Sequence, residues 1–561
     1  MTVGSPPSPF SQNKQNEPAV AVNPIDPSIV AAGVNEEVDM EACNNRADTT
    51  CPFTQGVGVS GVYFSNDSGS SWSQPTYSGW TARDCLGVPG TDPGNPADNC
   101  DPHPGPIGTL PRYYENGLVS DGDPAVGFGP QPDSQGHFSW SNGWRLYYAN
   151  LTANFSAQRS EHAFKGFEAI GVSRLDSQNY AAAQSGDNTA WMAPVIASRQ
   201  NAALFSDHEM VSVDDAASSP FFGNVYVCNA AFRSQEIGGF PEPIVLNASS
   251  DGGNTWRTTQ LSPAVDNNHN GGRQDCAVNT DSSGTLYVFW DGFDKQANSD
   301  AIYMIRSHDG GVHFERPARI VTHFVSSGIF DPVGGFTNDG VAGARDGSFP
   351  TVDIANGAPS GADASDEIVL AWTEGPTPTD PSEPNERVHV LYSKNGGNSW
   401  HSGGIASPTS DRPDFPAIAI SPNGQDAYLT YMSFLQPYQS TTADPRMFQG
   451  VVTHADVDPA SGEIGDWSEI DRGPAGDARG SSANALDSEF LGDYNFAFAT
   501  DAFAVAVWND GRDASDCPAE DAYRQSLVDG TPGARPAVQQ DCPATFGNTD
   551  IYGGSYPDPT P

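Results

Sequence analysis

Four short segments of this chain repeat one pattern, Ser-x-Asp/Asn-x-Gly-x-x-Trp/Phe, and this repeat restricts the possible folds more than any other feature. The pattern occupies residues 65–72, 249–256, 307–314 and 393–400, with Asn395 in place of aspartate in the last copy. Asp and Asn side chains bond their own backbone, and Gly adopts the positive φ that tight turns need. The sequence therefore predicts a β-hairpin that recurs along the chain.

A second repeated unit, independent of the turns, opens seven short alternating strands. Each opener is followed by a second strand rich in β-branched and aromatic residues, and in four units a third strand leads into the turn. Seven such units predict an all-β fold, a seven-bladed β-propeller of four-stranded antiparallel blades, with six blades as the alternative. The aligned opener residues are Glu17, Asp123, Glu209, Asp275, Phe349, Phe415 and Asp493.

The repeats also suggest where the domain begins and ends. Residues 1–11 are rich in Pro and Ser and are expected to form a disordered arm. Residues 12–556 are expected to form one propeller with loop insertions, and residues 557–561 a tail. The longest insertions are predicted at residues 80–112, 152–190, 321–347 and 514–546.

The net charge argues against several kinds of partner. With 70 acidic and 26 basic residues the formal charge is −44, which repels nucleic acid and anionic membranes. The simplest interpretation of this charge is that the acidic side chains lie on a surface exposed to solvent. No apolar run approaches the length of about 20 residues that a membrane-spanning helix needs. The N-terminus lacks a hydrophobic signal core, so we interpret the sequence as a mature secreted chain.

Eight cysteines fall in neighbouring pairs along the chain. An even count in this arrangement favours disulfides in an oxidising compartment, and zinc is the alternative, without any C-x-x-C motif to support it. The expected pairs are Cys43 with Cys51, Cys85 with Cys100, Cys228 with Cys276, and Cys517 with Cys542.

The turn motif resembles the Asp-box, the bacterial neuraminidase repeat of sialidases and other secreted propellers. By repeat pattern the resemblance covers residues 12–556, and it implies that Asp67, Asp251 and Asp309 hold turns away from the active face. It also implies that the openers and the ends of the second strands surround one end of a central channel. Those second-strand ends are residues 35–37, Arg233, Asp291, Glu374, Asp510 and Arg512.

Sialidases use an arginine triad, a tyrosine nucleophile paired with glutamate, and an aspartate acid/base. The resemblance implies Asp275 and Asp493 as acid/base candidates, with Tyr494 and Glu374 as nucleophile and partner. The first blade lacks an F-R-I-P or Y-R-I-P signature, and Glu17 stands near the place of that arginine. Expected substrate contacts are the polar residues Arg233, Arg273, Asp291 and Arg512, together with Trp290, Trp372 and Trp508, which could stack on sugar rings.

The ring of opener carboxylates leaves three interpretations open. The carboxylates could bond backbone amides of neighbouring blades, bind calcium through Glu17, Asp123 and Glu209, or catalyse glycoside cleavage. Two functions follow: a secreted glycoside hydrolase that acts on extracellular glycans, or a non-catalytic propeller that binds a glycan, a protein or a cell-surface component. No organic cofactor is expected.

Overall fold

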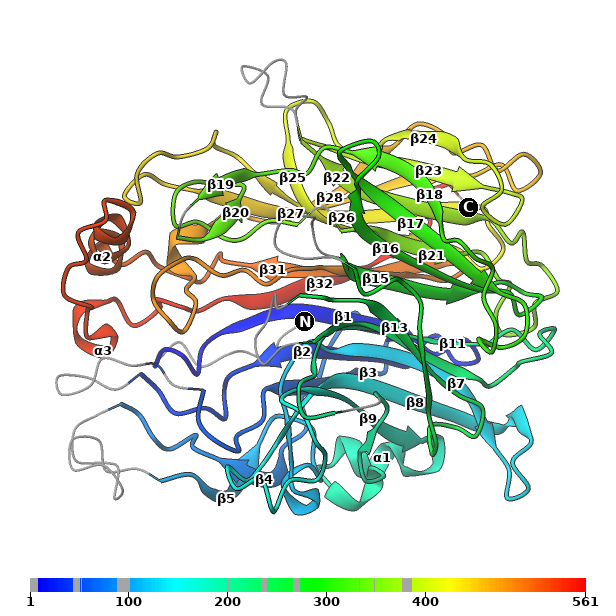
Figure 1. Cartoon of the computed structure of the whole chain (residues 1–561), viewed down its shortest axis with the longest axis horizontal. Coiled ribbons are helices and arrows are strands. Elements are labelled where there is room, and N and C mark those ends of the chain that lie inside the picture. The colour runs from blue at the N-terminus through cyan, green and yellow to red at the C-terminus, as the bar shows by residue number, and fades with distance from the viewer. Residues whose placement is uncertain are drawn as a thin grey trace.

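The chain forms seven small antiparallel sheets arranged in a ring, a seven-bladed β-propeller (Figure 1). The computed structural model describes residues 9–43, 51, 53–87, 101–198, 201–233, 240–265, 273–331, 333–347, 349–375 and 386–560. The predicted fold is confirmed, and the six-bladed alternative is wrong. Blades 2 to 6 have four strands or more, whereas blades 1 and 7 have three in the part of the chain that the structure describes.

The first four blades follow one another along the chain, and in each the inner strand comes before the outer ones. Blade 1 contains β1 (Gln15–Val22), β2 (Val30–Glu36) and β3 (Ser60–Ser65). Blade 2 contains β6 (Leu118–Ser120), β7 (Ala125–Pro132), β8 (Phe138–Asn154), β9 (Ala169–Asp176) and β10 (Val195–Ile196). Blade 3 contains β11 (Phe205–Val213), β12 (Val225–Phe232), β13 (Ile244–Ser249) and β14 (Arg257–Gln260). Blade 4 contains β15 (Arg273–Thr280), β16 (Leu286–Asp294), β17 (Ser299–Ser307) and β18 (Arg319–Phe324).

The remaining blades keep the same order. Blade 5 contains β21 (Thr351–Ile354), β22 (Ile368–Glu374), β23 (Arg387–Ser393) and β24 (His401–Ile405). Blade 6 contains β25 (Arg412–Ile420), β26 (Asp426–Phe434), β27 (Met447–Asp456), β28 (Ser468–Arg472) and β29 (Gly476–Asp477). Blade 7 contains β30 (Phe496–Ala499), β31 (Phe503–Asp510) and β32 (Asp550–Pro557).

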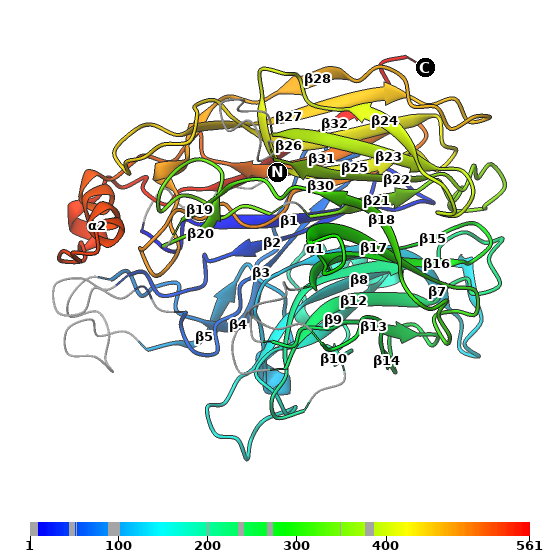
Figure 2. The same cartoon turned by 45° about the horizontal axis from the view of Figure 1, so that its top comes forward.

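Among the described residues, the segments that connect the blade strands carry two hairpins, three α-helices and four 3-10 turns. The hairpins are β4 (Tyr77–Thr81) with β5 (His103–Ile107), and β19 (Ile329–Asp331) with β20 (Gly335–Thr337). The α-helices are α1 (Tyr180–Gln184), α2 (Pro518–Val528) and α3 (Val538–Asp541), with 3-10 turns at Tyr114–Asn116, Ser177–Asn179, Asn188–Ala190 and Ala478–Gly480. Figures 1 and 2 show α2 and the β19–β20 hairpin at the same end of the molecule. Within the described ranges, no helix is both long and apolar enough to span a membrane.

Seven of the hydrophobic clusters are each formed by the facing sides of two successive blades, and three smaller clusters involve the insertions. Val20 and Val30 of blade 1 pack against Val505 and Val507 of blade 7, for example. The other six of these seven clusters join blades 1 and 2, 2 and 3, and so on to blades 6 and 7. Because a blade is covered on both sides, its strands are buried on both faces, and each large apolar side chain stabilises the ring by about 1.5–3 kcal/mol.

The ring closes between blade 1 and blade 7. The inner strand β1 packs beside β7 on one side and β30 on the other. The backbone amide of Gln15 donates to Thr549 O at 2.9 Å, and the Thr549 hydroxyl donates to Gln15 O at 2.9 Å. Phe10, in the segment expected to be an arm, is buried and lies 5.3 Å from the Phe546 ring. The described start of the chain therefore packs against the segment before β32.

Three of the expected disulfides are confirmed. Cys43 pairs with Cys51, Cys228 with Cys276, and Cys517 with Cys542. The Cys228–Cys276 bond joins β12 to β15 and therefore ties blade 3 to blade 4. Cys85 is disulfide-bonded, but its expected partner, Cys100, lies outside the described residues.

The four repeated turns share one set of hydrogen bonds. In the copy at Ser249 the serine hydroxyl accepts from Gly253 N at 2.9 Å, and the same bond recurs at Ser65, Ser307 and Ser393. Gly253 has a φ of 81°, which a residue with a Cβ rarely adopts. Ser249 lies opposite Val225, the first residue of β12, so the turns lie at the end of the propeller where the second strands begin.

Candidate functional site

One end of the central channel gathers the first residues of the inner strands. Gln274 at the start of β15 lies opposite Asp291 on the second strand, so openers and second-strand ends share this end, as predicted. The inner strands surround a cavity of about 400 Å³. We call this end the channel mouth and define it by the opener residues Glu17, Asp123, His208, Asp275 and Asp493.

A backbone irregularity sets the direction of the opener side chains. Five non-glycine openers have positive φ: Glu17 (54°), Asp123 (49°), His208 (47°), Asp275 (57°) and Phe415 (51°). In β1, β11, β15 and β25 the strand register slips at this point, which is the mark of a β-bulge. Such φ values cost about 1–3 kcal/mol, and bulges re-aim side chains next to functional sites. His208, Asp275 and Phe415 consequently line the cavity.

The position of the bulge shows that Glu209 of blade 3 was the wrong residue to align with the other openers. His208, rather than Glu209, has the positive φ and is the equivalent of Glu17 and Asp275. Glu209 is one residue further along, is 2% exposed, and has no hydrogen-bond donor to either carboxylate oxygen within the described part of the chain. Burial raises the pKa of Glu209 well above its ordinary value, and the negative charges of Asp123 and Asp207 add to the shift.

Glu17 and Asp123 are connected through Asn35. The Asn35 amide donates to Glu17 Oε2 and, at 2.9 Å, to Asn16 Oδ1, and its oxygen accepts from Asp123 N at 2.8 Å. Burial raises the pKa of Glu17 well above the ordinary value, and Asp123 and Asp493 raise it further. In the described residues, Glu17, Asp123 and Glu209 do not bring three donor atoms within 4.8 Å of one another. Calcium binding by these residues stays a prediction.

His208 and Asp275 form an ion pair on the cavity wall. His208 Nδ1 contacts Asp275 Oδ1, and both side chains are buried. Burial alone would lower the pKa of His208, but Asp275 and the nearby Asp123 and Asp207 outweigh it and raise the pKa to about 9. For Asp275, burial exceeds the opposing effect of His208 and raises the pKa.

Asp493 forms a second ion pair, with Arg345. Arg345 Nε donates to Asp493 Oδ1 at 2.6 Å, and Nη2 donates to Oδ2. The Arg345 side chain is 48% exposed, so this pair faces solvent while the His208–Asp275 pair does not. Tyr494 follows Asp493 and is buried, and its ring centroid lies 5.1 Å from that of His208. Burial and the carboxylates of Asp123 and Glu17 raise the pKa of Tyr494 well above 10.

A line of polar residues lies behind the His208–Asp275 pair. Gln274 Nε2 donates to Asp207 Oδ2 at 3.0 Å, and Gln274 N donates to Asp291 Oδ1 at 3.1 Å. Burial, with help from Asp123, raises the pKa of Asp207 to about 8. Burial and Asp275 raise the pKa of Asp291 well above its ordinary value. Asp291 therefore adds a further carboxyl group to the negative charge around Asp275.

Other predicted site residues lie away from the cavity. Glu374 Oε2 lies 3.7 Å from His389 Nε2, and Glu374 does not line the cavity with Tyr494. Trp290, Trp372 and Trp508 are at most 3% exposed and belong to the cores between blades. Burial leaves these three indole rings without a face open to a sugar.

The predicted arginines also have partners outside the cavity. Arg233 donates to Gln260 Oε1, and Arg273 Nη1 donates to Pro263 O at 2.9 Å. Arg512 binds Asp510 through both Nε and Nη2 and stacks on Tyr552 at 3.7 Å. Arg345, by contrast, forms an ion pair with Asp493 at the mouth.

No family model matches this chain, and no curated protein matches it. Among solved structures, an α-L-arabinofuranosidase from Fusarium graminearum is similar, with 13% identity over 69% of this chain and 88% of that chain and a TM-score of 0.36. The intramolecular trans-sialidase from Ruminococcus gnavus has 10% identity over 74% and 89%, with a TM-score of 0.39. A Hadza microbial sialidase has 13% identity over 68% and 63%, with a TM-score of 0.35. These similarities do not bear on residue roles in this chain.

Proposed function

We propose that this chain is a glycoside hydrolase that acts on extracellular glycans at the channel mouth. The observation that carries the proposal is that two carboxyl groups, Asp275 and Asp493, line one cavity with different counter-charges. Asp275 is buried against His208, and Asp493 is partly exposed against Arg345. Glycoside cleavage uses two carboxyl groups whose environments separate their roles.

The environments suggest which group takes which role. Burial raises the pKa of Asp275, which is the direction that a general acid needs, while the ion pair with His208 opposes this shift. Asp493 is bound by the Arg345 guanidinium in a bidentate pair, which suits the second carboxylate, the one that acts on the sugar or on water. His208 and Arg345 are positioning residues in this scheme.

Tyr494 acts in this proposal as a neutral phenol. Its pKa is raised, because burial and the surrounding carboxylates oppose the phenolate form that a nucleophile needs. The expected glutamate partner, Glu374, lies beside His389 instead. We therefore assign Tyr494 to hydrogen bonding with the substrate. The three disulfides among the described residues agree with an oxidising compartment, where such glycans occur.

Hydrolysis of a panel of chromogenic glycosides, including arabinofuranosides and sialosides, tests the proposal. Asp275→Asn and Asp493→Asn should each lower kcat/KM at least about 100-fold on any substrate found. Asp309→Asn is the matched control, because Asn395 already occupies the equivalent place in the fourth turn. Unchanged turnover in both mouth variants, or no turnover of any glycoside by the parent chain, would overturn the proposal.

The alternative function is a non-catalytic propeller that binds a glycan or a protein. One observation favours it: Asp275 and Asp493 are already paired with cations of the same chain. A binding site of this kind would give saturable heat in calorimetry with glycans but no product. The same panel, followed for binding and for product, separates the two functions.

A further inference from the structure

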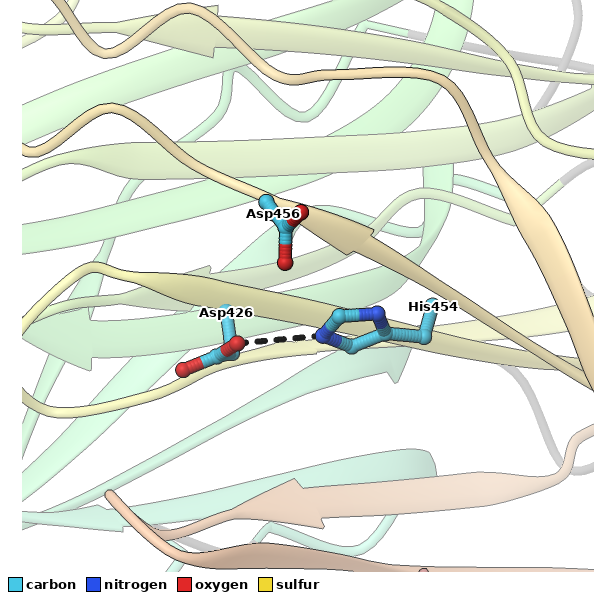
Figure 3. A group of neighbouring side chains, drawn as sticks. All are labelled: Asp426, His454 and Asp456. Carbon is cyan, nitrogen blue, oxygen red and sulfur yellow. Dashed lines mark hydrogen bonds and ion pairs between the residues drawn. The ribbon is translucent and has the colours of Figure 1, made fainter. Parts of the chain in front are cut away.

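A second polar cluster lies in blade 6, at the end of the propeller opposite the channel mouth. It consists of Asp426, His454 and Asp456, whose side chains converge in Figure 3. His454 Nε2 lies 3.0 Å from Asp426 Oδ1, and one ligand atom of each residue lies within 4.8 Å of the others. Asp426 is 7% exposed and His454 2% exposed, whereas Asp456 is exposed. The cluster is thus half buried and reachable from solvent.

The strand ladder fixes the three side chains on one face of the blade. Asp426 lies directly opposite Asp456, and Tyr428 lies opposite His454 on the paired strands β26 and β27. His454 and Asp456 are two residues apart on one strand, so they share a face. Two carboxylates directly opposite each other destabilise a sheet unless a cation lies between them. In the described ranges, no lysine or arginine forms an ion pair with either aspartate.

Blades 1, 3, 4 and 5 do not repeat this pair of carboxylates. In each of them the residue just after the inner strand donates its backbone N–H to the residue in the place of Asp426, and these residues are Ile29, Asn224, Thr285 and Glu367 in turn. In blade 5, where this residue is also acidic, Glu367 has the cation Lys394 3.7 Å away. Blade 6 instead places a second carboxylate opposite the first and adds a buried imidazole beside them.

The C-terminal tail reaches the same cluster. The Thr560 hydroxyl donates to Asp456 Oδ1 and lies 3.4 Å from Asp558 Oδ1. Asp558 follows β32 of blade 7 and accepts from Thr560 N at 2.7 Å. The tail of blade 7 therefore contacts one residue of the cluster directly, and a ligand that orders the Asp456 side chain would also order this contact.

We propose that Asp426, His454 and Asp456 bind one divalent cation of the zinc class, which fastens the C-terminal tail to blade 6. One imidazole nitrogen and two carboxylate oxygens suit Zn²⁺, whereas Ca²⁺ and Mg²⁺ prefer ligand sets of oxygen alone. Two ligands about 2.1 Å from one ion lie about 3.0–3.5 Å apart, which agrees with the His454–Asp426 separation. Water would complete the coordination. The site is independent of the channel mouth and of the function proposed for it.

The test is calorimetric titration of the chelator-treated full chain with Zn²⁺. We expect one equivalent to bind, and Asp456→Ser to weaken this binding at least about ten-fold. Asp456 is exposed at the end of its strand, so the variant should fold. Asp426→Asn, which copies Asn224 at the equivalent place in blade 3, is the second variant and should have the same effect. Zn²⁺ should raise the Tm of the parent chain and of neither variant.

His323→Gln is the matched control, because His323 Nε2 lies 2.9 Å from Asp294 Oδ2 in a comparable pair. It should leave the affinity for Zn²⁺ unchanged. The proposal is overturned if the parent chain binds no stoichiometric Zn²⁺, if both variants bind it as tightly as the parent, or if Ca²⁺ binds the site as tightly as Zn²⁺. An anomalous difference peak at the zinc edge beside His454 would support it directly.

Discussion

Arg345 reaches across the channel mouth and binds both carboxylate oxygens of Asp493. Arg345 lies between β20 and blade 5, whereas Asp493 opens blade 7, so the ion pair passes over blade 6. The guanidinium also lies 4.9 Å from the Phe490 ring, and its Nη2 is 4.0 Å from Glu17 Oε1. An insertion between blades 4 and 5 thereby sets the charge at the openers of blades 7 and 1.

Arg345→Gln should reduce the proposed glycosidase activity much more than it reduces stability. The guanidinium is 48% exposed, so its ion pair contributes about 1 kcal/mol or less to the free energy of unfolding. Its loss removes the positive charge that positions Asp493, so kcat should fall. Urea unfolding and kcat on the substrate found by screening measure the two effects. Arg345→Lys should recover only part of the activity, because lysine cannot bind both oxygens in the same way.

The control for this change is Arg319→Gln. Arg319, on the outer strand of blade 4, makes an ion pair of comparable exposure with Glu315, with Nη2 2.8 Å from Oε2. It should change neither kcat nor, by more than about 1 kcal/mol, stability. Equal kcat values for the two glutamine variants would show that Arg345 has no role in the reaction.

The stability of the protein should fall as the pH rises from about 4 to 9. The folded pKa of Asp207 is raised to about 8 from 3.8, and that of His208 to about 9 from 6.5, so the native state holds protons that the unfolded chain releases. Their stabilisation is complete below the unfolded pKa values and is lost as the pH passes the folded ones. Burial likewise raises the pKa of Asp215 and Asp353 to about 7. Calorimetric Tm values at constant salt measure the decline.

His208→Gln separates the histidine contribution from that of the carboxyls. The variant leaves Asp275 buried without its cation and should be less stable at every pH. Between about pH 6.5 and 9 the variant should nevertheless lose less of its free energy of unfolding than the parent chain does. The difference in this loss should be on the order of a few kcal/mol. His323→Gln, which changes an exposed histidine, should leave the slope unchanged. Parallel curves for parent and His208→Gln would contradict the assignment.

The fold could be predicted from the sequence because its repeats are local. Each turn is specified within eight residues by a serine, an aspartate or asparagine, and a glycine, and each inner strand by strict alternation. The pairing of Cys228 with Cys276 was also accessible, since the two strands that carry them belong to successive blades. Closure into seven blades follows because every blade buries both of its faces.

The channel mouth was harder to predict from the sequence than the fold was, because its geometry depends on a one-residue bulge. Glu17 lies five residues before the end of its inner strand, and so does His208. An alignment of the strand ends, rather than of the acidic residues, would therefore have matched His208 with Glu17. Arg345 precedes the opener of blade 5 in the sequence, but it lies in an insertion without a repeat, so its partner Asp493 in blade 7 could not be identified from the pattern. Trp290 stands at a second-strand end, but its side chain points into the core, where it stacks on Tyr303 at 5.9 Å.

Asp251→Asn should be almost neutral, whereas Asp251→Ala should destabilise the protein. Asp251 Oδ1 accepts from the backbone amides of Asn254 and Thr255 at 3.0 and 2.9 Å. Asn395 Oδ1 makes the equivalent bond to Ser399 N at 2.9 Å, so an amide can replace the carboxylate. Alanine leaves those amides without the acceptor and should cost about 1–2 kcal/mol in urea unfolding. If Asp251→Asn cost as much as Asp251→Ala, the charge rather than the acceptor would hold the turn.

Removal of the Cys228–Cys276 disulfide should lower both stability and activity. The bond closes a loop of 48 residues between blades 3 and 4, and its loss should reduce the free energy of unfolding by about 2–4 kcal/mol. Cys276 directly follows Asp275, so loosening it should also disturb the carboxyl on the cavity wall. The double variant Cys228→Ala/Cys276→Ala would be measured by Tm and by kcat/KM. Cys517→Ala/Cys542→Ala is the control, because that bond lies in the insertion containing α2 and α3, and it should lower Tm while kcat/KM stays unchanged. Equal losses of activity in the two double variants would show that the effect comes from general destabilisation and not from the position of Asp275.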